Sequence, residues 1–225
     1  MSASLNLGKL HRVRAVGEDL QGNSYESLEQ MWKTQITAPL KSKVTTRRST
    51  SGTATKQSWY KVAVDYWDRQ PATVDGVLGG FEDIHETESQ TSERMIREHL
   101  KYMPGKDLAL DCGAGIGRVT KTVLKHIFKN VDLLEPSKTQ MVEARKYCPE
   151  ARKFHHIGLQ EFGYKEPYDA IWIQWVLCYL TDEDIVHFLL KTKRDGLTRD
   201  EKGKTGLIFI KENTSEQSQF LLDTE

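Results

Sequence analysis

The sequence is short of long apolar runs and has no excess of charge of either sign. Lys and Arg together number 32, as do Asp and Glu, so the formal net charge is +0. That balance argues against a dedicated nucleic-acid binder, whose affinity rests on excess Lys and Arg. The most apolar stretch, 170–180, contains Gln174 and is shorter than the roughly 20 apolar residues of a membrane span. We therefore expect a buried strand there, and neither a nucleic acid nor a membrane as partner.

Cysteine is also scarce, and its placement suits neither disulfides nor metal. Cys112, Cys148 and Cys178 are odd in number and widely spaced, which favours a reducing compartment over a disulfide framework. The sequence has no CxxC or HExxH motif and no Cys/His cluster, so we expect no metal site. The cytoplasm and the nucleus are the expected compartments.

The chain divides into a tail and one domain. Its 225 residues suffice for an α/β domain with a full core, or for a domain plus a tail. Residues 1–57 lack sustained periodicity, and 41–56 are basic, rich in Ser and Thr and free of acids, which predicts a disordered tail. An organelle transit peptide is the alternative, although the acids between 18 and 29 weaken it. The domain is expected over 58–225, with a helical extension at 58–103.

A glycine-rich turn follows the first apolar strand of this domain. The strand is predicted at 108–112, the glycines are Gly113, Gly115 and Gly117, and 119–129 has apolar residues at helical spacing. Strand, glycine turn and helix form the first half of a βαβ unit.

Further segments indicate a doubly wound sheet. Apolar runs at 131–134, 168–173 and 206–210 predict strands, and 181–191 predicts a helix with Thr181 as its N-cap. We therefore expect an α/β, Rossmann-like fold, with a mostly parallel sheet and helices on both faces.

The carboxyl ends of these strands are the expected ligand site. Ligands of open α/β sheets bind at that edge, which groups Gly113, Glu135, Gln174 and 211–213 around one cleft. Glu135 ends the second strand, where an acid can accept hydrogen bonds from ribose hydroxyls.

The glycine spacing favours S-adenosylmethionine (SAM) over NAD. The glycines follow G-x-G-x-G, not the G-x-G-x-x-G with which dinucleotide enzymes bring a helix N-terminus onto a pyrophosphate. SAM has no phosphate, and its methionine end can lie over a turn that lacks side chains. Asp111 before the turn and Arg118 after it can meet the amine and the carboxylate of that end. The alternative is that the glycines only allow tight packing of strand and helix.

Several segments together resemble one family. They are 66–67 (YW) with 71–80 (PATVDGVLGG), 110–118 (LDCGAGIGR), 158–162 (GLQEF), 171–176 (IWIQWV) and 210–213 (IKEN). On these residues the chain resembles the protein N-terminal methyltransferases, SAM-dependent enzymes that methylate the α-amino group of proteins exposing an Xaa-Pro-Lys or Xaa-Pro-Arg N-terminus. The resemblance runs from about residue 60 to the last residue and implies the class I methyltransferase fold.

The resemblance also implies a SAM site and a channel for the N-terminal segment of a protein substrate. The residues expected to bind SAM are Gly113, Gly115, Arg118, Glu135, Pro136, Ser137, Leu159, Gln160 and Gln174. Those expected to bind the substrate are Tyr66, Trp67, Leu78, Trp175, Asn213 and Asp223. Asn213 would bond the peptide terminus and Asp223 the basic third residue of the substrate. These two and Tyr179 are the candidate catalytic residues.

Two features depart from the family pattern. The family has a His at the position of Tyr179, where a general base is useful, and a Tyr with the ordinary pKa near 10 is a poor base at pH 7. The family also has a second acid beyond Asp223, then a helix and two closing strands, whereas only 211–225 follow the fifth predicted strand. We therefore expect the C-terminal strands of the fold to be missing.

Three functions remain open at this point. The preferred one is α-amino methylation of proteins that begin Xaa-Pro-Lys or Xaa-Pro-Arg. The second is a catalytically impaired, methyltransferase-like protein that binds the peptide or a partner methyltransferase, and the third is a methyltransferase of another substrate. The segment after the fourth strand lacks the Asn/Asp-Pro-Pro-aromatic sequence of adenine-amino methyltransferases, which disfavours nucleic acid as that substrate.

Overall fold

The apolar runs expected as strands pair in one parallel sheet. Its strands are, in chain order, β3 (Leu108–Cys112), β4 (Asn130–Leu134), β5 (Lys153–His155), β6 (Ala170–Gln174) and β7 (Leu207–Lys211). The order across the sheet is β5-β4-β3-β6-β7, and every neighbouring pair is parallel. The strand order therefore reverses between β3 and β6, which is the switch point where such sheets bind ligands. The expected α/β, Rossmann-like fold is confirmed, and β5 is a strand that the sequence pattern did not predict.

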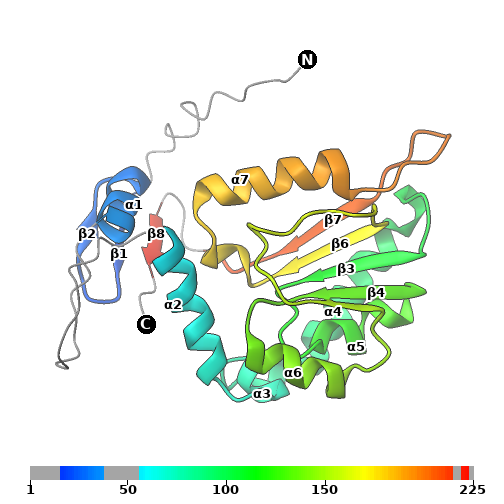
Figure 1. The fold of residues 1–225 in the computed structure, drawn as a ribbon, viewed down its shortest axis with the longest axis horizontal. Helices are drawn as coiled ribbons and strands as arrows, with labels where there is room; N and C mark the ends of the chain where they lie inside the picture. The colour runs from blue at the N-terminus through cyan, green and yellow to red at the C-terminus, as the bar shows by residue number, and fades with distance from the viewer. Residues whose placement is uncertain (1–15, 38–55, 215–218, 223–225) are drawn as a thin grey trace. The chain divides into compact units, whose positions relative to one another are not determined.

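This computed structural model describes residues 16–37, 56–214 and 219–222. The chain forms two units, of which one is Ala63–Glu212 and the other combines Met1–Val62 with Asn213–Glu225. The parallel sheet lies in the first unit, and a three-stranded sheet lies in the second (Figure 1).

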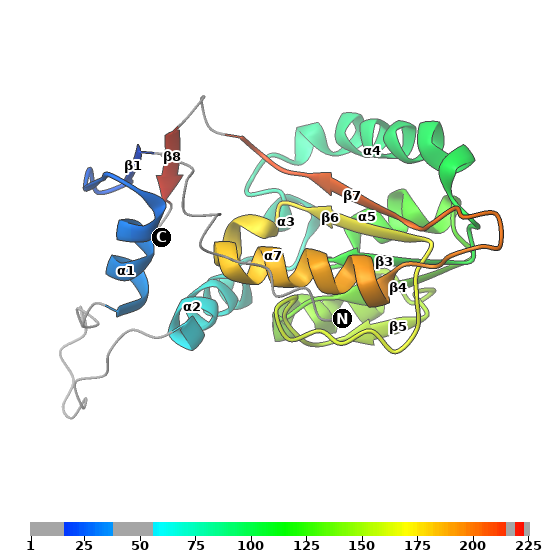
Figure 2. The ribbon, with the colours of Figure 1, turned by 90° about the horizontal axis from the view of Figure 1, so that it is seen from above.

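Helices cover both faces of the parallel sheet. α4 (His85–His99) and α5 (Arg118–Thr122) lie over one face and α7 (Asp182–Lys191) over the other (Figure 2). The core beneath α4 and α5 takes alternate residues from the strands, because successive side chains of a strand point to opposite faces. Its buried members are Ile96, Met103, Ala109, Val119, Val123, Leu124, Ile127, Phe128, Val131, Ala170, Trp172 and Phe209.

Shorter elements complete this unit. α6 (Lys138–Tyr147) follows β4, α3 (Val74–Val77) precedes α4, and α2 (Lys56–Arg69) spans the boundary of the two units. The helix expected at 119–129 is divided into α5 and a 3-10 turn, η4 (Leu124–His126), because Val123 leaves the helical conformation with φ −128° and ψ −64°. The remaining turns are η2 (Glu82–Ile84), η3 (Leu100–Tyr102), η5 (Leu177–Tyr179) and the π-helical turn η6 (Thr192–Gly196).

The smaller sheet joins segments from the two ends of the chain. Its order is β2 (Ser24–Tyr25), β1 (Val16–Asp19), β8 (Gln219–Leu222), and β1 pairs in parallel with β8. α1 (Leu28–Thr37) belongs to the same unit. The cluster that packs there consists of Tyr25, Met31 and Leu222 with Leu28, Trp32, Trp59 and Phe220.

The prediction of a disordered tail over 1–57 is therefore wrong for 16–37. Asp19 fixes the turn between β1 and β2, since its carboxylate accepts hydrogen bonds from Asn23 and Tyr25. The strand partner of β1 lies about 200 positions further along the chain, and pairing over such a separation leaves no local periodicity to detect. The basic segment of the prediction, apart from Lys56 in α2, lies outside the described residues.

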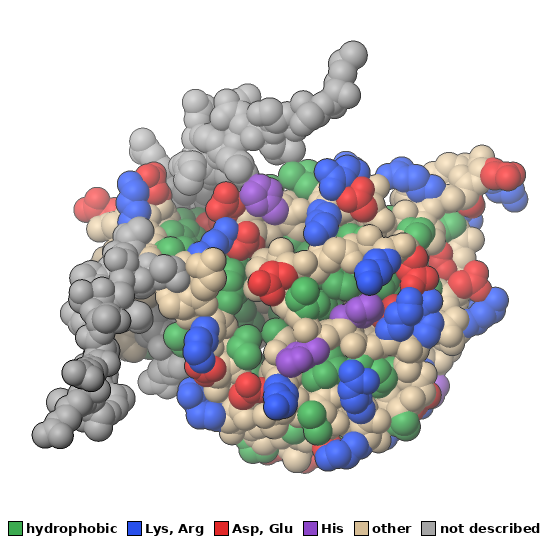
Figure 3. Space-filling model, viewed as in Figure 1, with side chains coloured by type: hydrophobic (Ala, Val, Ile, Leu, Met, Phe, Trp, Pro, Cys, Tyr) green, Lys and Arg blue, Asp and Glu red, His purple; other side chains and the backbone are tan. Residues whose placement is uncertain are grey.

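The surface is mixed in charge. On the face shown in Figure 3, Lys and Arg side chains are interspersed with Asp and Glu. Within the described ranges, no helix has the length and hydropathy needed to cross a bilayer. The same residues contain no group of three or more His, Cys, Asp or Glu side chains suited to hold a metal ion.

Candidate active site

The glycine turn between β3 and α5 requires its glycines for conformation and for packing. Gly113, Gly115 and Gly117 have φ of 66°, 54° and 82°, which side chains rarely adopt. A Cβ at Gly113 would lie 2.6 Å from the side chain of Val176, and one at Gly115 would lie 3.2 Å from Val77. The turn is thus enclosed between the segment after β6 and helix α3.

Helix α3 accounts for the specific 71–80 segment. The Thr73 hydroxyl caps α3 by accepting the amide proton of Gly76 at 3.0 Å. A Cβ at Gly76 would lie 1.9 Å from the Pro71 carbonyl oxygen, so only glycine fits there. Leu78, a predicted substrate contact, is buried at the end of this short helix.

Glu135 holds the glycine turn from the end of β4. Its Oε2 accepts the amide proton of Gly115 at 2.9 Å, and its Oε1 accepts that of Ser137 at 2.7 Å. Burial raises the pKa of this carboxyl to about 7, against the hydrogen bonds that lower it. Each oxygen accepts one N–H and can accept a second donor, as the expected contact with ribose hydroxyls requires.

The residues that follow Glu135, Pro136 and Ser137, make hydrogen bonds within the fold. The Ser137 hydroxyl caps α6 through the amide of Gln140 and donates to Asp68 at 2.6 Å, and its side chain is fully buried. The Pro136 carbonyl oxygen lies 2.9 Å from Nε2 of His156. The predicted places of Pro136 and Ser137 beside the adenosine stay predictions.

Asp111 is tied to the start of α5. Its Oδ2 accepts both the amide and the hydroxyl proton of Thr120, at 3.1 and 2.7 Å, and burial raises its pKa to about 6. Only Oδ1 is left to accept a hydrogen bond from the amine of SAM, the contact that the sequence suggested for Asp111.

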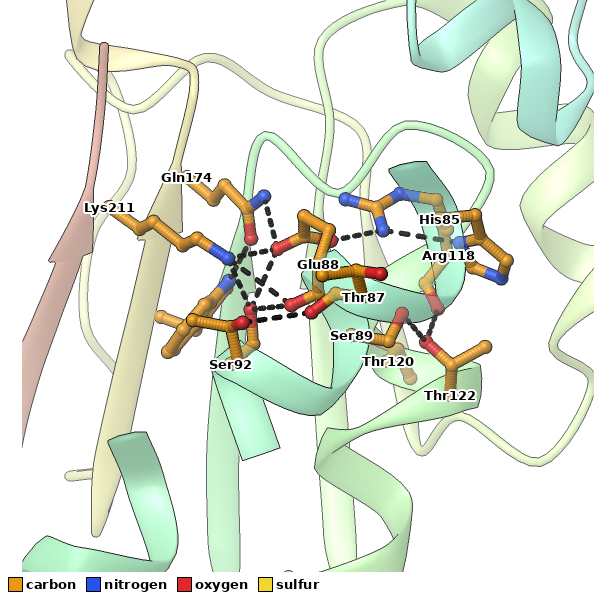
Figure 4. Close-up of polar contacts among 12 residues, drawn as sticks. His85, Thr87, Glu88, Ser89, Ser92, Arg118, Thr120, Thr122, Gln174 and Lys211 are labelled. Carbon is orange, nitrogen blue, oxygen red and sulfur yellow. Dashed lines mark hydrogen bonds and ion pairs between the residues drawn. The ribbon is translucent and has the colours of Figure 1, made fainter. Parts of the chain in front are cut away.

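Arg118, the first residue of α5, forms a buried ion pair with Glu88 of α4. Its NH1 lies 2.5 Å from Glu88 Oε2, and Nδ1 of His85 lies 3.4 Å from the same nitrogen (Figure 4). Although burial alone raises the pKa of Glu88, the charge of Arg118 and the hydrogen bonds to this carboxylate lower it to about 2. Glu88 is therefore ionised at neutral pH.

The other carboxylate oxygen of Glu88 accepts hydrogen bonds from side chains of α4, β6 and β7. Its Oε1 accepts hydrogen bonds from Gln174 Nε2 at 2.8 Å, from the Ser92 hydroxyl at 2.7 Å and from the Lys211 ammonium group (Figure 4). The amide oxygen of Gln174 accepts from the indole of Trp172 at 3.1 Å, so both ends of the amide are fixed. One buried carboxylate thus organises both Arg118 and Gln174.

Sequence reasoning missed Glu88 and Ser92. Together with Ile96 they occupy positions i, i+4 and i+8 of α4, and all three are buried. A charged residue on the apolar stripe of a helix is the signal that could have found Glu88, because such residues are rarely buried unless paired.

Aromatic rings from the end of α2 and from the segment after β6 contact one another or Arg118. Tyr66 and Trp67, at the end of α2, are edge-to-face with centroids 5.4 Å apart, and Trp67 is edge-to-face with Tyr179 at 6.2 Å. Trp175 lies with its ring 5.8 Å from Cζ of Arg118. The predicted substrate residue Trp67 and the candidate catalytic residue Tyr179 are thus brought together, and Trp175 lies against the predicted cofactor residue Arg118.

The backbone of Trp67 and the side chain of the next residue, Asp68, are hydrogen-bonded to the beginning of α6. The Trp67 carbonyl oxygen accepts from Gln140 Nε2 at 3.2 Å, and Asp68 accepts from the Ser137 hydroxyl and the Thr139 amide. Gln140 Oε1 is buried and has no hydrogen-bond partner among the residues that the structure describes.

Four other predicted site residues have less defined places. Leu159 is buried. Gln160 packs closely on Gly158, since a Cβ added at Gly158 would lie 2.5 Å from the amide oxygen of Gln160. Asn213 is exposed and belongs to the other unit of the chain. Asp223 lies outside the described residues.

The donors and acceptors of this site fit SAM. Arg118 uses NH1 for Glu88, and within the described part of the chain its Nε and NH2 have no hydrogen-bond partner, which leaves donors for a carboxylate. Glu135 offers acceptors for ribose hydroxyls at the end of the adjacent strand, and the glycine turn between them carries no side chain. A site of this kind at the switch point of a parallel sheet defines a class I SAM-dependent methyltransferase.

Comparisons with known proteins give the same class and narrow it to a family. The solved structure of a SAM-dependent methyltransferase from Leishmania major is 34% identical with a TM-score of 0.76, over 94% of this chain and 78% of that one. A phosphoethanolamine N-methyltransferase from Haemonchus contortus, 20% identical over 75% of this chain and 34% of that one, shares the fold with a TM-score of 0.58. Residues 55–225 match the family described as AdoMet dependent proline di-methyltransferase, and the chain belongs to this family.

Curated relatives agree with this assignment. The alpha N-terminal protein methyltransferase 1 of Dictyostelium discoideum is 36% identical, over 93% of this chain and 74% of the relative. The N-terminal Xaa-Pro-Lys N-methyltransferase 1-B of Xenopus laevis is 40% identical, over 74% of this chain and 76% of the relative. The chain is thus a SAM-dependent N-terminal protein methyltransferase, and the expected family, activity and cofactor are confirmed.

Proposed function

We propose that this enzyme methylates the α-amino group of proteins whose N-terminus reads Xaa-Pro-Lys or Xaa-Pro-Arg. The observation that carries the proposal is the set of aromatic rings Tyr66, Trp67 and Tyr179, with Trp175 against Arg118. Aromatic faces suit a Pro ring, and they attract the cation that forms as the amine is methylated. The Xenopus laevis relative is named for the same Xaa-Pro-Lys substrate class.

The residues of the site fall into two groups, those that bind the methyl donor SAM and those that bind the methyl acceptor, the peptide. Arg118 binds the carboxylate of the methionine end of SAM, and Glu135 binds the ribose. Gln174 binds SAM through the amide N–H that is not bonded to Glu88. Trp67, Trp175 and Tyr179 line the channel for the first residues of the substrate. Leu159 and Gln160 border the adenine, and Asn213 and Asp223 bind the peptide.

The chemical demand on these residues is modest. SAM supplies an activated methyl group on a sulfonium. The protein aligns the amine nitrogen in line with that methyl group and excludes competing orientations, which is an entropic contribution. An α-amino group has an ordinary pKa of about 7.7–8.0, so a minority is already neutral at pH 7. A strong general base is therefore not required. Tyr179 contributes by packing its ring against Trp67 in the channel.

A peptide pair tests the proposal. A Ser-Pro-Lys peptide and its N-acetylated copy are incubated with the enzyme and SAM, and their masses are measured. We expect mass gain in steps of one methyl group on the free peptide alone. Gain on both peptides would move the reaction to the lysine side chain, and gain on neither, from folded protein that binds SAM, would contradict the proposal.

One observation favours a second candidate, a methyltransferase-like protein that binds peptide without turnover. The family His is replaced by Tyr179, which packs on Trp67. This candidate predicts that calorimetry detects binding of the peptide to the folded protein, and that SAM or its product increases the affinity. It also predicts that the mass of the peptide stays unchanged after incubation with SAM.

A further inference from the structure

Trp175 is held in a conformation that a bulky side chain avoids. Its φ is 54°, and among the described residues it alone combines a side chain with a positive φ. Such a conformation persists only where the surroundings fix it, and it is often found at functional sites. The first question is therefore which contacts hold the backbone at this point.

The carboxylate of Glu212 supplies two of these contacts. Its Oε1 accepts the amide protons of Val176 and Leu177, each at 2.9 Å. The amide of Trp175 itself donates to the carbonyl oxygen of Lys211 at 3.1 Å. Three successive amides after β6 are thus bound by two successive residues at the end of β7.

The turn that these bonds hold, residues 175–177, contacts both halves of the site. Val176 packs on Gly113 of the glycine turn, where a Cβ would lie 2.6 Å away. The Trp175 ring lies by Arg118, and the 3-10 turn that begins at Leu177 carries Tyr179 to Trp67. A shift of this turn would therefore move the predicted channel relative to the cofactor site.

We propose that Glu212 is a positioning residue, which clamps the 175–177 turn so that Trp175 and Tyr179 line the peptide channel beside the cofactor. This inference deepens the proposed function and rests on it, because it assumes that a peptide occupies the channel. Glu212 acts through the turn and need not touch the substrate.

A different role for the same carboxylate makes a contrasting prediction. Glu212 is half-buried, and burial raises its pKa. A carboxylate of this kind can also take a proton from an amine. The substitution Glu212→Gln separates the two roles, because an amide oxygen can accept the same two backbone protons but cannot act as a base.

The experiment compares Glu212→Gln, Glu212→Ala and Glu212→Asp with the wild type and with Glu201→Ala, which changes an exposed glutamate near the start of β7. Affinities for a Ser-Pro-Lys peptide and for S-adenosylhomocysteine are measured by calorimetry, and kcat and KM by methylation. We expect Glu212→Ala and Glu212→Asp to weaken peptide binding about tenfold or more, since neither side chain reaches both amides. Glu212→Gln and Glu201→Ala should stay within about twofold of the wild type, and S-adenosylhomocysteine affinity should change little in any variant.

Two results would overturn the proposal. One is unchanged peptide affinity in Glu212→Ala. The other is a loss of kcat in Glu212→Gln as large as in Glu212→Ala with peptide affinity preserved, which would make Glu212 the base. If Glu212→Ala does not fold, the comparison of Glu212→Asp with Glu212→Gln still decides the question.

Hydrogen exchange tests the clamp independently of any substrate. The amides of Val176 and Leu177 should exchange slowly in the wild type and in Glu212→Gln, and faster in Glu212→Asp. Rapid exchange in the wild type would contradict the clamp. A wild type that shows slow exchange but neither binds nor methylates the peptide would instead contradict the proposed function.

Discussion

Glu88 and Arg118 form a buried ion pair, with Oε2 and NH1 2.5 Å apart, that joins α4 to the beginning of α5. The other carboxylate oxygen of Glu88 accepts from Gln174 and from Lys211. The two side chains expected at the methionine end of SAM are therefore oriented by one residue of the helical segment that precedes the glycine turn.

Replacing Glu88 should weaken cofactor binding and destabilise the fold. Glu88→Gln removes the carboxylate that Arg118 and Lys211 share, and breaking a buried pair costs about 3–5 kcal/mol because a charge is left uncompensated. We expect the affinity for S-adenosylhomocysteine to fall about tenfold and the free energy of unfolding to fall by about 3 kcal/mol. Calorimetry and urea denaturation measure the two effects.

Glu93→Gln is the matched control on the same helix. Glu93 pairs with Arg97 at the surface, where an ion pair contributes little. Its substitution should leave both measurements within error of the wild type. Equal effects of the two substitutions would contradict the role of Glu88 in cofactor binding and stability.

The parallel sheet and the arrangement of the expected cofactor residues at its edge were accessible from the sequence because their signals are local. The glycine turn, the strand that precedes it and Glu135 at the end of the next strand lie within 28 positions, from Leu108 to Glu135. Glu88 and Glu212 were less accessible, because their roles depend on bonds to Arg118 and to the turn after β6, formed only on folding. Likewise, the pairing of β1 with β8 could not be predicted from periodicity.

The pH dependence of cofactor binding should follow Glu135. Burial raises the pKa of this carboxyl to about 7, so the free enzyme holds a proton there over much of the range below pH 7. Ribose hydroxyls that donate to the carboxylate favour its ionised form, so binding lowers the pKa and releases a proton. We therefore expect the affinity for S-adenosylhomocysteine to rise between pH 6 and pH 8, by up to about tenfold per unit below the pKa.

Calorimetry in two buffers of different ionisation enthalpy measures the released proton directly. Glu135→Gln should bind more weakly and lose the part of the pH dependence that Glu135 contributes, because an amide at this position does not titrate. Proton uptake by the wild type at pH 6.5 would show that the cofactor binds the protonated carboxyl.

Tyr179 should act through its ring and not through its hydroxyl. The ring is edge-to-face with Trp67, and Phe preserves that contact. Tyr179→Phe should therefore keep kcat/KM for a Ser-Pro-Lys peptide within about twofold, whereas Tyr179→Ala should lose about tenfold through KM, as aromatic pairs contribute about 0.5–1.5 kcal/mol beyond their buried area. A large loss of kcat in Tyr179→Phe would instead make the hydroxyl part of the proton transfer.

The strain at Trp175 can be measured by comparing two truncations of the same side chain. Trp175→Gly and Trp175→Ala both remove the ring beside Arg118, so both should lose peptide affinity. They differ in the backbone, because φ of 54° is unfavourable for Ala and free for Gly. Trp175→Gly should therefore be the more stable of the two by about 1 kcal/mol, after the greater entropy of unfolded Gly is subtracted. Equal stabilities in urea denaturation would mean that the turn relaxes once the ring is gone, and that the ring itself holds the backbone in this conformation.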